Sequence, residues 1–257
     1  MRGTGDQFGY EWGKYTAILP EFEDQFLNWI EPIGPADFRA AAVLDAGCGI
    51  GRNSFWALKY GAAKVVACDI DDRTLASASA NLAHDQRSEV VRCSIDALPW
   101  RDAFDVAMSI GVIHHVPDPR RAVANLVTAT KPGGRTVIWV YGREGNELLL
   151  LFLRPLRAVT KRLPPRVTHA LTYLFSVPLY AAIKLIPTRH PYFQRARTWR
   201  FNHLHLIVFD QLLPRIANYW TKAEALDLFR DLPVARLEAF QKNNNSWTVI
   251  AVRAQTT

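Results

Sequence analysis

The chain has 257 residues, of which 49% are hydrophobic and 21% are charged. This length and balance suit one large α/β domain, or a domain of about 200 residues with an insertion. They exclude disordered, collagen-like and coiled-coil proteins. The three cysteines have no metal-ligand spacing, exclude a disulfide framework and favour a reducing compartment. The first fifteen residues mix polar and aromatic side chains, so we expect no secretory signal and a cytoplasmic protein.

The net charge of +7 is concentrated in one segment. Residues 143–200 contain eleven Lys and Arg but only two acidic residues, so this stretch carries +9 and the rest of the chain carries −2. The basic character therefore concerns the partner of that segment and says little about the protein as a whole.

Residues 43–142 alternate short apolar runs with amphipathic stretches, a pattern typical of a parallel sheet covered by helices. The expected strands span 43–45, 64–69, 89–94, 104–110 and 135–141, and the expected helices span 54–60, 72–83 and 118–130. A proline and two glycines at 132–134 predict a turn before the fifth strand. Units in this order predict a doubly wound sheet with right-handed crossovers.

The remainder of the chain departs from this rhythm. Residues 143–205 hold apolar stretches broken by Arg, Lys and Pro, which predicts a mostly amphipathic helical insertion. Thr221 and Glu224 form a capping box that predicts a helix to about residue 232. Strands expected at 234–240 and 247–253 form a closing hairpin, which indicates an antiparallel last strand inserted into the sheet. The predicted parts are an N-terminal arm (1–40), a core (41–142), the insertion (143–205) and the C-terminal part of the core (206–257).

A glycine turn follows the first strand, with Gly47, Gly49 and Gly51 directly before a helix. This strand–turn–helix context is the one in which a ligand touches the main chain. Folds that bind nicotinamide cofactors favour a third glycine one residue later, where this chain has Arg52. The carboxylate of Asp45, inside the strand, would repel a pyrophosphate. It suits a cationic ligand, such as one that carries an ammonium and a sulfonium group.

Two further acidic residues lie at the ends of the next strands. Asp69 ends the second strand, where a carboxylate accepts hydrogen bonds from both hydroxyls of a ribose. Asp96 follows the third strand, in a place suited to accept from an adenine amino group. An isolated Asp is usually a solvated turn residue, but three at successive strand ends, in register with the glycine turn, predict a binding site.

With these motifs, residues 43–142 resemble the class I S-adenosylmethionine-dependent methyltransferases, and most closely the type 11 branch that includes enzymes of ubiquinone and menaquinone biosynthesis. The resemblance rests on 44–51, 66–71, 94–99, 104–119 and 131–140, together with the helix entrance at 219–224. It implies a Rossmann-like sheet of seven strands with the last one antiparallel, and S-adenosylmethionine as the cofactor. The implied cofactor-binding residues are Asp45, Gly47, Cys48, Gly49, Gly51, Asp69, Ile70, Asp96, Ala97 and Ser109.

Two histidines, His114 and His115, follow the fourth strand at the edge where the transferable methyl group should lie. One interpretation makes either histidine a general base or an acceptor-orienting group, because its pKa lies near neutrality. The other interpretation makes them structural residues that cap the next helix or form a wall of the cofactor pocket. Because no metal-ligand spacing is present, we expect a metal-independent transfer.

Further residues are candidates for binding the acceptor. Arg143, after Tyr141 at the end of the fifth strand, either meets an anionic acceptor or is solvated. His203 and His205 are expected on one side of an extended segment, where they act together or form a structural pair. Aromatic side chains near the N-terminus form either a lid or cation–π cage, or part of the core; they are Tyr10, Trp12 and Tyr15.

The basic insertion leaves three interpretations open: a lid over the site, a lid that also docks on an anionic membrane surface to reach a lipid-linked acceptor, or a nucleic-acid contact. Its longest uncharged run, 170–183, has 14 residues including Pro178 and is too short to cross a bilayer.

The function expected from these observations is methyl transfer to a small-molecule or lipid-linked acceptor, with the insertion as a lid by default and contact to a membrane surface through 143–200 as an open alternative. The alternatives are a nicotinamide-dependent oxidoreductase, an RNA methyltransferase and a non-catalytic cofactor-binding module.

Overall fold

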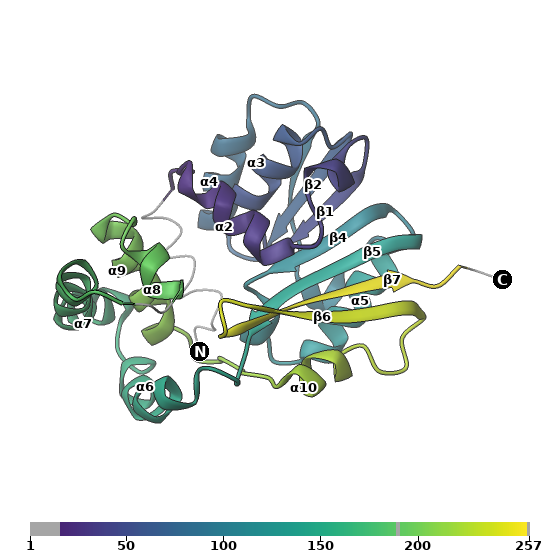
Figure 1. The fold of residues 1–257 in the computed structure, drawn as a ribbon. Helices are drawn as coiled ribbons and strands as arrows, with labels where there is room; N and C mark the ends of the chain where they lie inside the picture. Colours follow the sequence, from purple (N-terminus) through teal and green to yellow (C-terminus); the bar gives the residue numbers. More distant parts are fainter. Residues whose placement is uncertain (1–15, 189–190, 256–257) are drawn as a thin grey trace. The chain divides into compact units, whose positions relative to one another are not determined.

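The structure is a computed structural model that describes residues 16–188 and 191–255 (Figure 1). The chain divides into two compact units, which are described separately. The helical unit is Gly145–Arg215, and the sheet unit consists of 16–144 and 216–255. Both names are used below in this sense.

The sheet unit contains a sheet of seven strands in the order β3-β2-β1-β4-β5-β7-β6 (Figure 1). The first five strands run parallel, and β7 lies antiparallel between β5 and β6. This confirms the predicted fold class, including the inserted antiparallel strand. The strands are β1 (Ala42–Ala46), β2 (Lys64–Asp69), β3 (Ser88–Arg92), β4 (Phe104–Ile110), β5 (Thr130–Tyr141), β6 (Val234–Lys242) and β7 (Ser246–Arg253).

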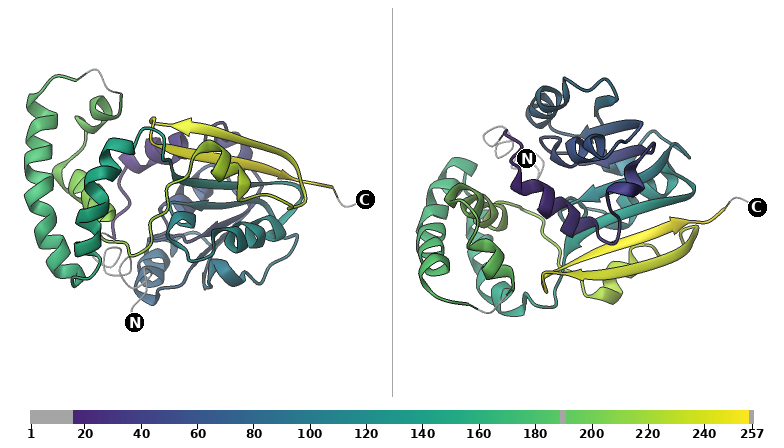
Figure 2. Two further views of the ribbon diagram at one scale, coloured as in Figure 1. Left: turned by 90° about the horizontal axis from the view of Figure 1, so that it is seen from below. Right: turned by 45° about the horizontal axis from the view of Figure 1, so that its top comes forward.

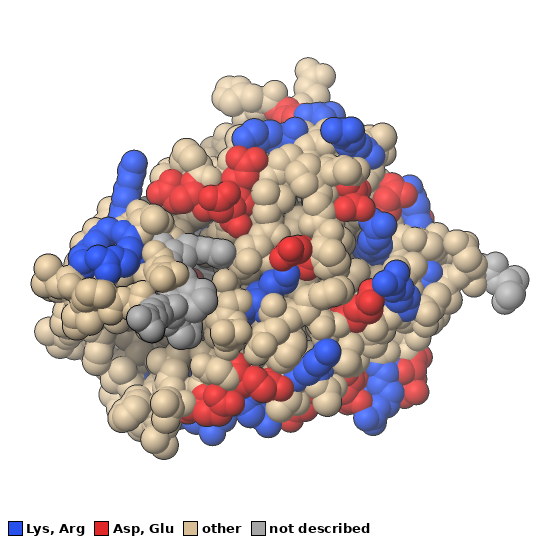
Figure 3. Space-filling model, viewed as in Figure 1, with Lys and Arg blue, Asp and Glu red and all other residues tan. Residues whose placement is uncertain are grey.

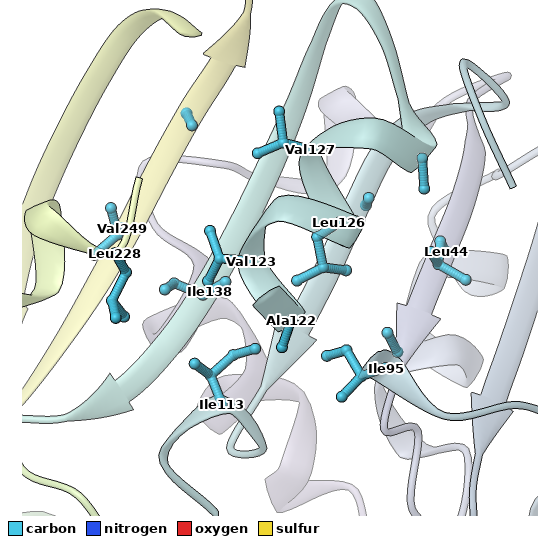
Figure 4. Packing of buried hydrophobic residues seen from close by; sticks show 14 of the residues in the cluster. Leu44, Ile95, Ile113, Ala122, Val123, Leu126, Val127, Ile138, Leu228 and Val249 are labelled. Atoms are coloured by element: carbon cyan, nitrogen blue, oxygen red, sulfur yellow. The ribbon is translucent and has the colours of Figure 1, made fainter. Parts of the chain in front are cut away.

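Helices cover both faces of this sheet, which explains why the central strands read as continuous apolar runs. On one face, α5 (Pro119–Ala129) and α10 (Lys222–Asp227) pack on a buried cluster that includes Leu126 and Ile138 (Figure 4). On the other face, the cluster includes residues of α2 (Glu21–Ile30), α3 (Arg52–Lys59) and α4 (Asp72–Leu82). The helices on the two faces hold the strands in place. The edge of the sheet at which the carboxyl ends of the strands lie is therefore fixed as well.

Side-chain caps start the helices where the sequence supplies them. The carboxylate of Asp71 accepts hydrogen bonds from backbone N–H groups of the first turn of α4, and Asp118 does the same for α5. The predicted capping box of Thr221 and Glu224 is confirmed at the start of α10, with both of its hydrogen bonds present. This helix ends at Asp227, earlier than expected.

The helical unit holds α6 (Glu147–Thr160), α7 (Pro165–Leu185), α8 (Pro191–Ala196) and α9 (Phe201–Leu212) (Figure 2). A helix therefore continues through residue 205, where the predicted insertion ends. Within 16–188 and 191–255, no helix combines the length and apolar character needed to span a membrane.

The predicted turn at 132–134 falls inside β5, which begins at Thr130. The strand pairs with β4 and β7, however, skip 131–134 and continue from Arg135, where the fifth strand was predicted to begin. The pairing of β5 with β4 shifts register between Phe104 and Val106, opposite this stretch. Gly133, with φ of +78°, occupies the left-handed region that glycine adopts easily. The proline and glycines thus mark an irregularity inside a strand rather than its boundary.

Candidate active site

The carboxyl ends of β1, β2, β3 and β4 meet at one edge of the sheet (Figure 1). Ala46 pairs with Cys68 of β2, and Asp69 pairs with Arg92 of β3. Because parallel strands in register end together, the residues that follow them share this edge. In open α/β sheets of this kind, ligands bind outside the carboxyl ends of the strands, near the point where the strand order reverses. Here that point lies between β1 and β4.

The glycine turn after β1 is held by its backbone. The N–H groups of Gly47 and Cys48 both donate to the carbonyl of Cys68, at 2.8 and 3.0 Å. Gly47 has φ of +80°, and a Cβ atom there would lie 2.4 Å from a methyl carbon of Val112. No side chain fits at that distance, so glycine is required for conformation and for space. Val112 in turn brings the segment after β4 against the turn.

Asp45 lies fully buried in β1. One of its carboxylate oxygens accepts a 2.7 Å hydrogen bond from the hydroxyl of Ser54, in the first turn of α3. The other, Oδ1, is buried without a hydrogen-bond partner among the described residues. Burial raises the pKa of Asp45 to about 6, an effect that the Ser54 hydrogen bond only partly opposes. A buried carboxylate oxygen of this kind is suited to a cationic hydrogen-bond donor.

Asp69 links the end of β2 to the glycine turn. Its carboxylate accepts hydrogen bonds from the backbone N–H of Gly49 at 3.1 Å, of Ile70 at 2.7 Å and of Asp71 at 3.2 Å. Burial raises the pKa of Asp69, and these hydrogen bonds oppose that shift. The side chain of Ile70 beside it is 54% exposed. An exposed apolar side chain at this edge offers a flat ligand a packing surface.

Asp96 lies in a single helical turn, η2 (Ile95–Ala97), after β3. The hydroxyl of Ser94 caps this turn by accepting from the N–H of Asp96 at 3.2 Å. Oδ1 of Asp96 is a second buried carboxylate oxygen with no hydrogen-bond partner in 16–188 and 191–255. It can therefore accept from a ligand amino group.

Two other predicted cofactor residues face the protein interior. The hydroxyl of Ser109 is buried and donates to the carbonyl of Ala46 at 2.8 Å, so it ties β4 to β1. The thiol of Cys48 is buried, and burial raises its pKa. Both residues shape the turn from behind, whereas Ala97 is exposed on η2.

The two candidate catalytic histidines form η3 (Ile113–His115) after β4, and their environments differ. His114 is fully buried and stacks on Tyr141, with ring centroids 3.8 Å apart. Nδ1 of His115 lies 2.7 Å from the carbonyl oxygen of Ile216. Because a carbonyl only accepts, Nδ1 carries the proton, and Nε2 is the basic nitrogen of the neutral ring.

The end of β5 carries a short column of aromatic rings. The ring of Tyr141 stacks on Tyr219 at 5.1 Å as well as on His114. The guanidinium of Arg143, for which an anionic acceptor or solvation was expected, forms an ion pair with Glu224 at 2.9 Å. It also donates to the carbonyl of Tyr219 at 3.4 Å. This ion pair holds the start of α10 beside the end of β5.

The prediction that His203 and His205 share one side of an extended segment is wrong. Both lie in α9, where residues two apart point about 200° from each other. His203 stacks on Trp199, and His205 lies 2.8 Å from the hydroxyl of Ser176 through Nδ1. Both rings are buried in the helical unit. The other aromatic candidates, Tyr10, Trp12 and Tyr15, lie outside the described residues.

Three residues that shape the site were missed from the sequence. The amide of Asn81, in α4, donates to the carbonyl of Ile50 at 2.8 Å and so holds the glycine turn from outside. Val112 sets the close approach to Gly47, and Tyr219, which the sequence indicated only as part of the helix entrance at 219–224, extends the ring column. Each acts through a contact between distant segments, for which the sequence gives no local signal. In the described part of the chain, no group of three or more His, Cys, Asp or Glu is arranged to hold a metal ion.

Comparison with known proteins identifies the family. A family model described as a methyltransferase domain matches residues 44–138. A ubiquinone biosynthesis O-methyltransferase of Azotobacter vinelandii is 30% identical over 165 residues, which cover 62% of this chain and 68% of that protein. The chain belongs to the S-adenosylmethionine-dependent methyltransferases.

Other relatives of this methyltransferase match over a smaller part of their length. A tRNA U34 carboxymethyltransferase of Pseudoalteromonas translucida is 32% identical over 130 residues, or 50% of this chain and 39% of that protein. The chain spans only 32–39% of the length of the first three curated relatives that it matches. Human N-acetylserotonin methyltransferase, solved with S-adenosylmethionine, shares the fold with a TM-score of 0.58 at 12% identity, over 96% of this chain and 57% of that one.

The residues of this methyltransferase fit its cofactor, S-adenosylmethionine. The two buried carboxylate oxygens without partners, on Asp45 and Asp96, match the ammonium and the adenine amino group. Asp69 is placed for the ribose hydroxyls, and the glycine turn admits a ligand against its backbone. Arg52, at the position of the third glycine in nicotinamide folds, instead lies over the rings of Phe22 and Trp29.

Proposed function

We propose that this methyltransferase modifies a small-molecule or lipid-linked acceptor with a flat aromatic ring. The observation that carries this proposal is the column of stacked rings formed by His114, Tyr141 and Tyr219 at the carboxyl ends of β4 and β5. The faces of Tyr141 are covered by the other two rings, but the residue is only partly buried, so its edge offers a ligand ring an edge-to-face contact. The name of the Azotobacter relative, a ubiquinone biosynthesis O-methyltransferase matched over two thirds of its length, supports the same class of acceptor.

In this proposal the cofactor supplies an activated methyl carbon on a sulfonium, and the protein supplies alignment and a proton acceptor. Nε2 of His115 takes the proton of an acceptor hydroxyl as that oxygen attacks. The carbonyl of Ile216 fixes the tautomer that makes Nε2 the basic atom. His114 is fully buried in the ring column, and its role is to position Tyr141.

RNA is the second candidate acceptor, since several matched relatives are named as tRNA methyltransferases and the helical unit is basic. Those relatives are matched over at most 39% of their length. The segment after β4, Ile113–Pro117, also has none of the Asn/Asp-Pro-Pro-aromatic sequence typical of enzymes that methylate base amines. A ring-bearing small molecule is therefore the better-supported acceptor.

A methyl-transfer assay distinguishes these acceptors. The purified protein is incubated with S-adenosylmethionine carrying a labelled methyl group and with either a phenol that bears a short isoprenoid chain or total tRNA. We expect saturable label in the phenol and none in the tRNA. Label in tRNA alone would overturn the proposal and would leave the methyltransferase assignment intact.

The assay also tests His115. The substitution His115→Asn keeps an N–H able to donate to the Ile216 carbonyl but removes the base, so we expect the turnover rate for the phenol to fall about a hundredfold or more. The affinity for S-adenosylhomocysteine should stay the same. His84→Asn, at an exposed histidine after α4, is the matched control. An unchanged turnover rate in His115→Asn would show that His115 is structural.

A further inference from the structure

In α7, the longest helix of the helical unit, the buried side chains are mostly polar and many of the exposed ones are apolar. Four of its five buried side chains are polar, namely Thr168, His169, Thr172 and Ser176, and the fifth is Ile183 near its C-terminal end. Its outward stripe is apolar, with exposed fractions of 43% for Val167, 68% for Leu174, 52% for Val177 and 78% for Leu185. A helix that faces water carries the opposite pattern. The outward stripe of α7 is therefore suited to an apolar environment.

The polar stripe of α7 is satisfied within the helical unit. The hydroxyl of Ser176 lies 2.8 Å from Nδ1 of His205, and Nε2 of His169 lies 3.3 Å from Nε2 of the same residue. The hydroxyl of Thr168 donates to the carbonyl of Thr160 at 3.2 Å. These contacts fix which side of α7 turns toward α9, and hence which side turns outward.

The neighbouring helix α6 presents a second apolar stripe. Leu148, Leu151 and Phe152 are 78%, 67% and 71% exposed. Its buried side is held to α9 by Arg157, which donates to the carbonyl of Gln211, and by Thr160, which donates to that of Leu212. Both stripes thus lie on the sides of α6 and α7 that face away from α9.

Exposed apolar side chains are concentrated in this unit. Of the fifteen large hydrophobic residues that are exposed among those the structure describes, fourteen lie in the helical unit, and the other is Ile70. Scattered exposure needs no explanation, but a concentrated apolar surface marks an interaction site. Such a surface costs free energy in water unless something covers it.

The charge of the helical unit indicates what covers it. The sequence from Gly145 to Arg215 contains eleven Lys and Arg and two acidic residues, a net charge of +9. Four of these cations lie on α6, in the connection to α7 and in the first turn of α7; they are Arg154, Lys161, Arg162 and Arg166. The surface over α7 in Figure 3 is mostly uncharged, with basic patches.

This combination favours one occupant. Two copies of the unit would bring +9 against +9, which opposes self-association through this surface. A nucleic acid would use the cations but would leave the leucines and valines uncovered. An anionic lipid surface takes both, because apolar side chains enter the boundary of the acyl chains while Lys and Arg meet the phosphates.

We propose that the helical unit docks on an anionic membrane surface, with the outward stripes of α6 and α7 at the headgroup–acyl boundary and Arg154, Lys161, Arg162 and Arg166 at the lipid phosphates. This docking does not require that the acceptor be lipid-linked. The docking proposal also holds if the methylated molecule is soluble.

Cosedimentation with vesicles tests the proposal. The full chain is mixed with vesicles of phosphatidylglycerol and phosphatidylcholine in equal parts, or of phosphatidylcholine alone. We expect binding to the anionic vesicles that weakens with added salt, and much weaker binding to the neutral ones. Absence of binding to the anionic vesicles, or a dimer that buries this surface and ignores lipid, would overturn the proposal.

Two double variants separate the apolar and charged contributions. Leu174→Ser with Val177→Ser should weaken binding to anionic vesicles at least tenfold, because two apolar side chains no longer enter the boundary. Arg162→Gln with Arg166→Gln should weaken it about 25-fold, since each cation near an anionic surface contributes about fivefold. Arg101→Gln with Arg121→Gln, at exposed arginines of the sheet unit, is the matched charge control and should bind like the wild type.

All variants should keep the wild-type affinity for S-adenosylhomocysteine and the wild-type methylation of the phenol without vesicles. These readouts show that the protein is folded, and they keep a failure of docking separate from a failure of the proposed function. If the serine variant bound anionic vesicles as well as the wild type, the contact would be purely electrostatic and the proposal wrong. If tRNA bound more tightly than the vesicles and lost affinity in the Gln variant, RNA would be the partner and the proposal would also be overturned.

Discussion

Replacing Gly47 with alanine should lower the free energy of unfolding by about 3 kcal/mol. The new Cβ atom would lie 2.4 Å from Val112, and the residue would keep a φ of +80° that alanine disfavours. Relief of either strain moves the turn after β1 or the segment after β4, and both border the candidate cofactor site. We therefore expect loss of S-adenosylhomocysteine binding as well. Urea denaturation and calorimetric titration measure the two effects.

Gly61→Ala is the matched control for this prediction. Gly61 has φ of +92°, but the nearest atom to a Cβ there is 3.8 Å away. The control has the conformational cost of alanine at positive φ but no steric clash. Its free energy of unfolding should fall by about 1 kcal/mol, and it should bind S-adenosylhomocysteine normally. Equal decreases in the free energy of unfolding of the two variants would show that Val112 does not exclude a side chain at position 47.

The substitution Asp45→Asn should weaken the binding of S-adenosylhomocysteine about thirtyfold at pH 8. It removes the charge from a buried group whose Oδ1 we expect to accept from the ligand ammonium, and a hydrogen bond between charged groups contributes about 2 kcal/mol. Ser109→Ala is the control, since its hydroxyl is bound to the Ala46 carbonyl and we expect no charge effect on the ligand. A normal affinity in Asp45→Asn would place the ammonium elsewhere.

The pH dependence of binding gives a second check on Asp45. Burial raises the pKa of Asp45 in the free protein to about 6. Only the ionised carboxylate attracts the ammonium, so the affinity of the wild type should be constant above that pH and fall as the pH drops through it. At pH 5 about a tenth of the carboxyl is ionised, and the wild type and Asp45→Asn should differ far less than at pH 8. An affinity that rose on acidification would contradict this role.

The sheet and its binding edge were predictable because their signals are local. Strands covered on both faces need continuous apolar residues, and β1, β2 and β4 have them. Asp45, Asp69 and Asp96 follow from their place at strand ends, since parallel strands in register end together. The capping box of α10 was predictable for the same reason, because Thr221 and Glu224 are only three residues apart in the sequence.

Other features depend on contacts that no short stretch of sequence reveals. The ion pair of Arg143 and Glu224 joins segments that are far apart in the chain, so the sequence around Arg143 does not indicate its partner. His203 and His205 read as an extended pair, but they belong to a helix whose register is set by packing on α7. The apolar and cationic mixture of the insertion was visible. The reversal of polarity on α7 was not, because it depends on which stripe is buried.

Calorimetric titration of the unmodified chain with S-adenosylhomocysteine and with NAD tests the central claim most directly. That claim is that a buried carboxylate at the end of β1 selects a nucleoside that carries an ammonium group over one that carries a pyrophosphate. The account predicts one S-adenosylhomocysteine bound per chain and no heat from NAD. Binding of NAD with no response to S-adenosylhomocysteine would contradict it.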